Sequence, residues 1–117
     1  MYNTQDIKEK LSGGFFDEQL AYLYSCKKDE TKKYAGRYLA VIDGLESTFG
    51  EADKIALFSA PGRTEIGGNH TDHQHGCVLA GSVNLDVIAA VKLNGTNQVR
   101  VKSEGYDTVI IDLDDLE

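Results

Sequence analysis

The side chains best suited to chemistry gather in one short stretch, residues 61–76. All three histidines of the chain lie there, together with Arg63 and Asp72. A carboxylate accepts hydrogen bonds from neighbouring hydroxyls, and an imidazole donates or accepts according to its tautomer. A guanidinium suits a carboxylate, a phosphate or the negative charge of a transition state. These are the groups that a small polyol-binding phosphotransfer site requires.

Glycines punctuate the same stretch and allow the backbone to turn and to approach a ligand closely. The stretch begins directly after the apolar run 55–58, which is typical of a buried strand. Binding groups often lie on a polar loop that a rigid strand positions. The pattern therefore predicts that residues 61–76 form a loop beyond a strand.

Other interpretations of these residues stay open at this point. Thr71 and Asp72 suit an ordinary turn with local side-chain hydrogen bonds to the backbone, and Arg63 suits a surface ion pair. A metal site is a further hypothesis, because imidazole and carboxylate bind zinc or iron. Its ligands would be His70, Asp72, His73 and His75. Their spacing matches no established ligand motif, and no cysteine lies beside them to complete a set, so no metal is expected.

The motif resembles that of the galactokinases, a family of the GHMP kinases. The family pattern has the loose form Pro-Gly-Arg, four variable residues, Gly, one variable residue, His-Thr-Asp, three variable residues and Gly. This chain matches it in register at Pro61, Gly62, Arg63, Gly68, His70, Thr71, Asp72 and Gly76. The segment Val78-Leu79-Ala80 resembles the next part of the family sequence.

The resemblance implies transfer of the γ-phosphate of ATP, with Mg²⁺, to the anomeric hydroxyl of galactose or a close analogue. It implies that Arg63 is catalytic and contacts the substrate beside the reacting hydroxyl, and that His70 and Asp72 contact sugar hydroxyls. Asn69 stands where the family usually has a substrate-binding glutamate, and its amide can still accept a hydrogen bond.

The resemblance also implies two parts that these 117 residues lack. The family's Gly- and Ser-rich nucleotide loop begins near a proline, and the one proline here is Pro61. The catalytic aspartate belongs to a later family segment. We therefore expect an inactive chain that binds no cofactor alone and forms the sugar-binding N-terminal part of a galactokinase. The alternative is a stand-alone sugar-binding or regulatory relative without catalysis.

The elements that position the motif are predicted to be helices followed by strands. Residues 1–50 carry helical spacing in three segments, 5–11, 17–26 and 30–49, with Thr4 as the first cap and Gly50 as the last. Residues 51–117 are rich in strand signals. Asn94-Gly95 predicts a hairpin between residues 85–93 and a return strand at 99–101. A last strand, 108–113, contains three consecutive apolar residues, which indicates burial on both faces.

Together these signals predict one domain over residues 1–117, an α+β fold with N-terminal helices packed on an antiparallel meander. The resemblance adds that this sheet is part of a larger GHMP-kinase N-terminal domain. Either the helices or further polypeptide would cover the last strand.

The composition excludes several classes of function. The net charge of −7 argues against nucleic-acid binding. The absence of a signal peptide and of a long apolar run predicts a cytoplasmic protein that does not bind membranes. Cys26 and Cys77 match no paired-cysteine motif and are expected to be reduced thiols. The sequence does not determine the oligomeric state.

Overall fold

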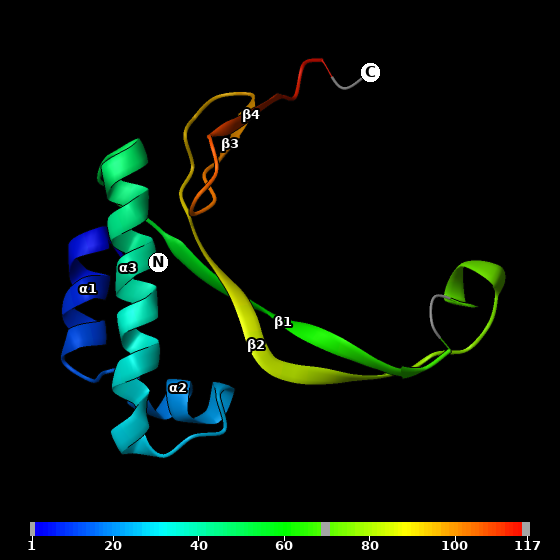
Figure 1. Cartoon of the computed structure of the whole chain (residues 1–117). Helices are drawn as coiled ribbons and strands as arrows, with labels where there is room; N and C mark the ends of the chain where they lie inside the picture. The colour runs from blue at the N-terminus through cyan, green and yellow to red at the C-terminus, as the bar shows by residue number, and fades with distance from the viewer. Residues whose placement is uncertain (1, 69–70, 116–117) are drawn as a thin grey trace.

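The computed structural model describes residues 2–68 and 71–115, and of Thr71 and Asp72 only the backbone. The chain begins with three α-helices, α1 (Thr4–Ser12), α2 (Asp17–Leu23) and α3 (Thr31–Phe49), and a short 3-10 helix η1 (Lys28–Glu30) precedes α3. α1 and α3 lie side by side, and α2 lies across the N-terminal end of α3 (Figure 1).

The first helix is capped by Asn3, not by Thr4 as the sequence predicted. The Asn3 side chain accepts a hydrogen bond from the Asp6 amide at 2.7 Å. Thr4 is instead the first helical residue and is buried, and its amide donates to the Ala52 carbonyl at 3.1 Å. Contact with the segment after α3 therefore displaces the cap by one residue, because it draws Thr4 inward.

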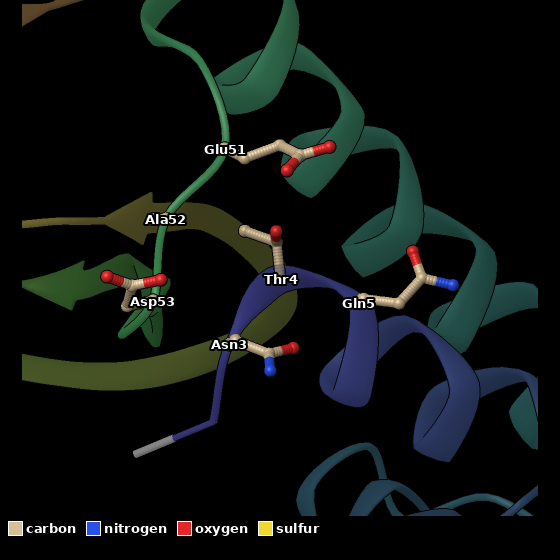
Figure 2. Close-up of a pocket in the computed structure, with 6 residues that line it drawn as sticks. All are labelled: Asn3, Thr4, Gln5, Glu51, Ala52 and Asp53. Carbon is tan, nitrogen blue, oxygen red and sulfur yellow. The ribbon is translucent and has the colours of Figure 1, made fainter.

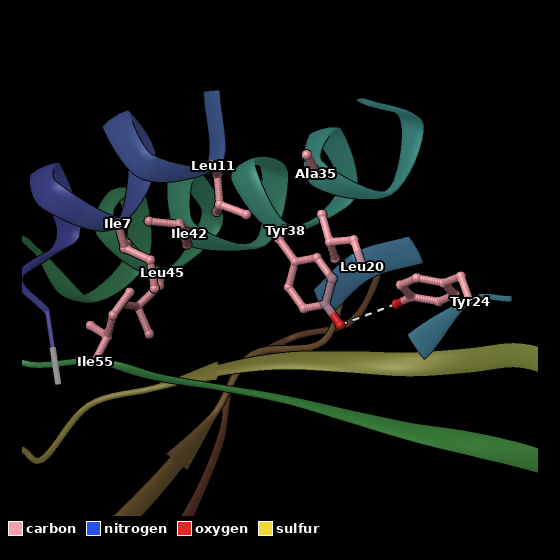
Figure 3. Packing of buried hydrophobic residues seen from close by; sticks show 9 residues of the cluster. All are labelled: Ile7, Leu11, Leu20, Tyr24, Ala35, Tyr38, Ile42, Leu45 and Ile55. Carbon is pink, nitrogen blue, oxygen red and sulfur yellow. Dashed lines mark hydrogen bonds between the residues drawn. The ribbon is translucent and has the colours of Figure 1, made fainter. Parts of the chain in front are cut away.

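The helices bury one apolar stripe each around a common core (Figure 3). Ile42, near the middle of α3, is fully buried with 0% of its surface exposed. The core consists of Ile7, Leu11, Leu20, Tyr24, Ala35, Tyr38, Ile42, Leu45 and Ile55. The last of these comes from the segment that enters the first strand, so the core joins the helices to the sheet.

The end of α3 confirms the predicted cap at Gly50. This residue has a φ of 79°, and its amide donates to the Glu46 carbonyl at 2.8 Å. Lys92 approaches from the end of a strand and donates to the carbonyls of Gly50 at 2.9 Å and Glu51 at 3.2 Å. A cation at a helix C-terminus is favourable because it faces the negative end of the helix dipole.

Two long antiparallel strands follow, β1 (Ala56–Gly67) and β2 (Leu79–Val91). The prediction of a loop over all of residues 61–76 was wrong for its first half, because residues 61–67 continue β1. Cross-strand pairs from Arg63↔Ser82 to Gly67↔Leu79 supply a ladder for this stretch. The ladder outweighs the glycine and polar composition that indicated a loop.

The remaining strands, β3 (Gln98–Val101) and β4 (Val109–Asp112), pair with each other in a separate two-stranded sheet. The predicted meander and the predicted hairpin between residues 85–93 and 99–101 were therefore wrong. A turn does occur at Asn94, where the side chain accepts from the Thr96 amide at 3.0 Å and donates to the Gln98 carbonyl at 2.8 Å. These local bonds redirect the chain without returning it alongside β2.

The expected burial of β4 on both faces was also wrong. Val109, Ile110 and Ile111 are 55%, 56% and 44% exposed. Their only strand neighbour among the described residues is β3, and the two-stranded sheet is set off from the helices (Figure 1). Three consecutive apolar residues favour burial, but in this two-stranded sheet they remain exposed.

The α+β class is confirmed, with helices packed on one face of an antiparallel pair. The radius of gyration is 17.6 Å, whereas a compact domain of this length has about 13 Å. The difference arises because the far half of the β1–β2 hairpin extends away from the helices (Figure 1). In the part of the chain that the structure describes, no helix is both long and apolar enough to cross a membrane.

Candidate functional site

The motif begins within β1 at Pro61, and its loop lies at the distal end of the β1–β2 hairpin, remote from the helices (Figure 1). β1 carries its first residues, the 3-10 helix η2 (Thr71–Gln74) carries the centre, and β2 begins after it at Leu79. The backbone of Asp72 lies in η2. Asn69 and His70 lie outside the described residues, so the structure does not test their predicted contacts with the sugar or the metal hypothesis that includes His70.

Arg63 lies on β1 directly beyond an irregularity in the ladder. Its side chain is 69% exposed, and its Nη2 atom is 3.4 Å from Glu65 Oε1. That distance is long for a charge-assisted hydrogen bond, and an exposed pair of this kind contributes little stability. The surface ion pair that the sequence left open is therefore present, and it restrains the guanidinium weakly.

The irregularity beside Arg63 is a β-bulge. Pro61 pairs with Asp86, but the next paired residue, Arg63, faces Ser82. A single residue of β1, Gly62, therefore lies opposite three residues of β2. A Cβ added at Gly62 would lie 3.1 Å from Val83 Cγ2, which is a tight contact. The Pro-Gly-Arg start of the motif is thus an interruption of regular strand pairing directly before the exposed arginine.

Gly68 closes the base of the motif loop. Its φ is 97°, a conformation that side-chain-bearing residues rarely adopt, and an added Cβ would lie 2.5 Å from the Cys77 carbonyl and 2.8 Å from Val78 Cα. The backbone at residue 68 therefore passes directly against the chain that enters β2. Glycine at this motif position lets the two ends of the loop meet.

A buried acidic residue, Asp86, ties the hairpin to the helices at the near side of the bulge. Its carboxylate is 7% exposed. One oxygen accepts from Tyr24 at 2.6 Å and Ser59 at 2.7 Å, and the other accepts from Arg37 at 2.6 Å. Tyr24 also contacts the hydroxyl of Tyr38 at 3.1 Å (Figure 3). α2, α3, β1 and β2 therefore meet at one carboxylate.

The electrostatics of this network favour the ionised carboxylate. Burial acts to raise the pKa of Asp86, but hydrogen bonds from Tyr24 and Ser59, with the hydrogen bond and charge of Arg37, outweigh it and lower that pKa. Burial, followed by hydrogen bonding to Asp86 and Tyr38, raises the pKa of Tyr24. Tyr24 is therefore a neutral donor to a charged acceptor.

The sequence analysis did not identify the Asp86 network. A signal was available, because Asp86 is a lone carboxylate within the otherwise apolar run from Leu85 to Val91. A carboxylate is rarely buried unless it is paired, so a cationic or hydroxyl partner for Asp86 could have been predicted. The identity of those partners depends on tertiary packing.

Among the described residues, a hollow of about 270 Å³ lies between the start of α1 and the segment after α3 (Figure 2), and no motif residue lines it. A second hollow, of about 110 Å³, lies beside the β-bulge and is lined in part by Pro61, Tyr24, Ser59 and Asp86. The smaller one therefore connects the start of the motif with the Asp86 network.

The β1–β2 hairpin lies within a region of the chain that matches a known protein family. Residues 45–93 match the family model described as the galactokinase galactose-binding signature. The matched range runs from the end of α3 through the complete β1–β2 hairpin. The fold and the match together define an α+β segment that carries a galactose-binding signature.

Several curated galactokinases are similar to this chain. That of Lactococcus lactis subsp. cremoris (strain MG1363) is 31% identical over 81 residues, which is 67% of this chain and 20% of the relative. That of Bacillus subtilis (strain 168) is 35% identical over 60 residues, 51% of this chain and 15% of the relative. That of Candida maltosa is 36% identical over 64 residues, 54% of this chain and 29% of the relative.

These matches confirm the resemblance to an N-terminal galactokinase segment that the motif predicted. The aligned part of the chain spans 20% of the Lactococcus relative, about a fifth of its length. No solved structure matches the chain at the same stringency as these relatives.

Proposed function

We propose that this chain is the galactose-facing part of a cytoplasmic galactokinase, which phosphorylates galactose at its anomeric hydroxyl with ATP. The observation that carries the proposal is the coincidence of the matched signature with one structural unit. The signature covers the whole β1–β2 hairpin, and that hairpin presents the motif at its exposed tip.

The residues of the motif have distinct proposed roles. Arg63, exposed beyond the bulge, stabilises negative charge at the reacting hydroxyl or the transferring group. Asp72 and His70 bind sugar hydroxyls, and the Asn69 amide replaces a carboxylate that usually contacts the sugar. The weak restraint on Arg63 by Glu65 supports its role, because the guanidinium can turn to a ligand at little cost.

We expect the nucleoside triphosphate to be bound outside these residues. The glycine pair Gly13-Gly14 precedes α2, as the glycines of a phosphate-binding loop precede a helix. The Asp17 carboxylate lies against this turn, because a Cβ added at Gly14 would be 2.8 Å from one of its oxygens. A carboxylate so close to the turn repels phosphate. ATP and Mg²⁺ would therefore be bound by other parts of a longer enzyme, and this chain alone would be inactive.

The test is kinetic, on the complete natural gene product that contains these residues. Arg63→Ala should lower kcat for galactose phosphorylation about 100-fold or more with little change in KM, because its contact forms in the transition state. Arg100→Ala, an exposed arginine on β3, is the matched control and should leave both constants unchanged. A rise in KM alone for Arg63→Ala would show that it merely binds the substrate.

Asp72→Ala should abolish galactose binding by the same gene product, because alanine cannot accept the hydrogen bonds that a carboxylate accepts from two hydroxyls. Asp107→Ala, an exposed aspartate before β4, is its control. Isothermal titration with galactose measures the effect, and unchanged affinity in Asp72→Ala would remove this residue from the site.

The stand-alone sugar-binding relative remains the alternative, and a separate measurement distinguishes it. Galactose at high millimolar concentration should then shift backbone amide resonances of the 117-residue chain within residues 61–76. No shift would count against a stand-alone binder and would leave the enzyme proposal to the kinetic test.

A further inference from the structure

The pairing of β1 with β2 is weakest where the motif begins. Pro61 has no amide hydrogen to donate to the ladder, and Gly62 has no cross-strand partner. Regular pairing resumes only with Arg63↔Ser82. A strand interrupted in this way specifies its register weakly, so contacts outside the ladder must hold the two strands in place here.

Asp86 supplies those contacts at the last regular pair before the bulge, Pro61↔Asp86. Ser59 of β1 donates to its carboxylate at 2.7 Å, which links the two strands by side chains. Arg37 of α3 donates to the other carboxylate oxygen at 2.6 Å and to the Asp86 backbone carbonyl at 3.2 Å. Both the side chain and the main chain of Asp86 are therefore held by α3.

The network around Asp86 is buried and is itself firmly held. The Asp86 carboxylate is 7% exposed, and Tyr24, which is 5% exposed, donates to it at 2.6 Å. The Tyr24 ring stacks on that of Tyr34 with centroids 3.8 Å apart, and its hydroxyl lies 3.1 Å from that of Tyr38 (Figure 3). Because a buried carboxylate that loses a donor is costly, these bonds resist displacement of Asp86 from its place opposite Pro61.

The direction of the Arg63 side chain depends on this anchor. Ser59, Pro61 and Arg63 occupy alternate positions of β1, and alternate residues of a strand lie on one face. Arg63 follows Pro61 by about 7 Å along the strand. A slip of one residue in register would move the arginine to the opposite face. Its own contact with Glu65, at 3.4 Å, is too weak to prevent this.

We propose that Asp86 is a positioning residue for Arg63. It fixes the register of β1 against β2 at the start of the motif, and so holds the guanidinium on the face where the sugar is phosphorylated. Asp86 acts through Arg63 and needs no contact with the substrate. This role rests on the proposed catalytic function of Arg63, so a change at Asp86 should lower turnover only where the Arg63 side chain is present.

The test is a double-mutant cycle on the complete natural gene product, with kcat and KM for galactose as the two readouts. Asp86→Asn keeps the size of the side chain, but its amide can accept hydrogen bonds at only one of the two positions. It should lower kcat at least about tenfold, because small misplacement of a catalytic group is costly, and change KM less than about twofold. In the Arg63→Ala background the same substitution should change kcat less than about twofold.

Lys92→Met is the matched control. Lys92 also ties the hairpin to α3, through the carbonyls of Gly50 and Glu51, but it does so at the base of the hairpin, away from the start of the motif. Lys92→Met should therefore leave kcat within about twofold of the wild-type value. An equal loss of kcat in Lys92→Met and Asp86→Asn would show that general loosening of the hairpin is responsible.

The possible outcomes separate this role from the proposed function. An unchanged kcat in Asp86→Asn, with an active wild type, would overturn the positioning role and leave the proposed function intact. An equal loss of kcat with and without the Arg63 side chain would show that Asp86 affects stability alone. A wild-type gene product that does not phosphorylate galactose would overturn both proposals.

A second variant decides the question if Asp86→Asn does not fold. Tyr24→Phe removes a single donor to Asp86 and keeps the ring stacked on Tyr34. It should lower kcat about threefold, in keeping with the loss of one hydrogen bond, and leave KM for galactose unchanged. Wild-type kcat in a folded Tyr24→Phe enzyme would contradict the positioning role.

Discussion

At the residue scale, two residues determine how the motif is held, and neither is among the proposed substrate contacts. Asp86 fixes the hairpin to the helices on the near side of the bulge through Tyr24, Ser59 and Arg37. Gly68 fixes the far end, where the loop closes on β2. The exposed arginine of the motif stands between these two fixed points.

Asp86→Asn should destabilise the chain by about 2 kcal/mol at pH 7, the usual contribution of hydrogen bonds to a charged group. The native pKa of Asp86 is lowered, so its stabilisation is present above the unfolded-state pKa of about 4 and is lost as the pH falls through the native value. The difference in unfolding free energy between wild type and Asp86→Asn should therefore shrink below pH 4.

Urea unfolding at pH 7 and at pH 3 measures this effect, with the exposed Asp107→Asn as the control. A difference that stays constant between the two pH values would show that the charge of Asp86 is not what stabilises the network.

Gly68→Ala should loosen the motif loop, whereas Gly67→Ala should not. At Gly68 the new Cβ meets the backbone of Cys77 and Val78 at a φ of 97°, while an added Cβ at Gly67 has nothing within 4 Å. Strain of this kind costs about 1–3 kcal/mol. Amide hydrogen exchange of Leu79 and Gly81 should accelerate at least about fivefold in Gly68→Ala alone. Equal rates in both variants would contradict the close approach.

At the scale of elements, α3 organises the fold, because its buried stripe contacts α1, α2 and the sheet. Lys8 of α1 reaches Asp43 of α3 at 2.6 Å and also bonds Glu46. Lys92 from the end of β2 bonds the carbonyls at the C-terminus of α3. The base of the hairpin is therefore oriented by this helix.

Ile42→Ala should destabilise the chain by about 2–5 kcal/mol, the range for truncating a buried aliphatic side chain. Ile42 is 0% exposed, so truncation leaves a cavity in the centre of the core. Leu23→Ala, at a helical position 51% exposed, is the control and should cost less than about 1 kcal/mol. Denaturant unfolding of both variants checks the prediction, and similar losses would mean that α3 is not packed as described.

The sequence predicted the helices well because their signals are local. The three- and four-residue spacing of apolar positions and the glycine at residue 50 encode α3 without reference to anything distant. The cap of α1 was displaced because Thr4 bonds Ala52, a tertiary contact that local pattern does not contain.

The strands were predicted less well because pairing is nonlocal. Asn94-Gly95 indicated a hairpin, but β2 pairs backward with β1, and β3 pairs forward with β4. Arg63 was identified from the motif, whereas the bulge directly before it arises from the shift in register between the pairs Pro61↔Asp86 and Arg63↔Ser82. Spacing along the chain identified candidate chemistry, and cross-strand register determined its orientation.

At the scale of the whole molecule, the hydrophobic core and the motif loop lie in different parts of the structure. The helices and the near half of the hairpin contain the core, while the motif extends from them on the distal half (Figure 1). This arrangement explains the large exposed area, because the distal half of the hairpin extends away from the core.

The most direct test of the central claim is the reaction of the complete natural gene product with galactose, ATP and Mg²⁺, followed by phosphorus NMR. The account predicts a resonance of galactose 1-phosphate that grows with time and is absent without galactose. No sugar phosphate from galactose or from closely related sugars, with a folded protein, would contradict the claim that these residues form the sugar-binding part of a galactokinase.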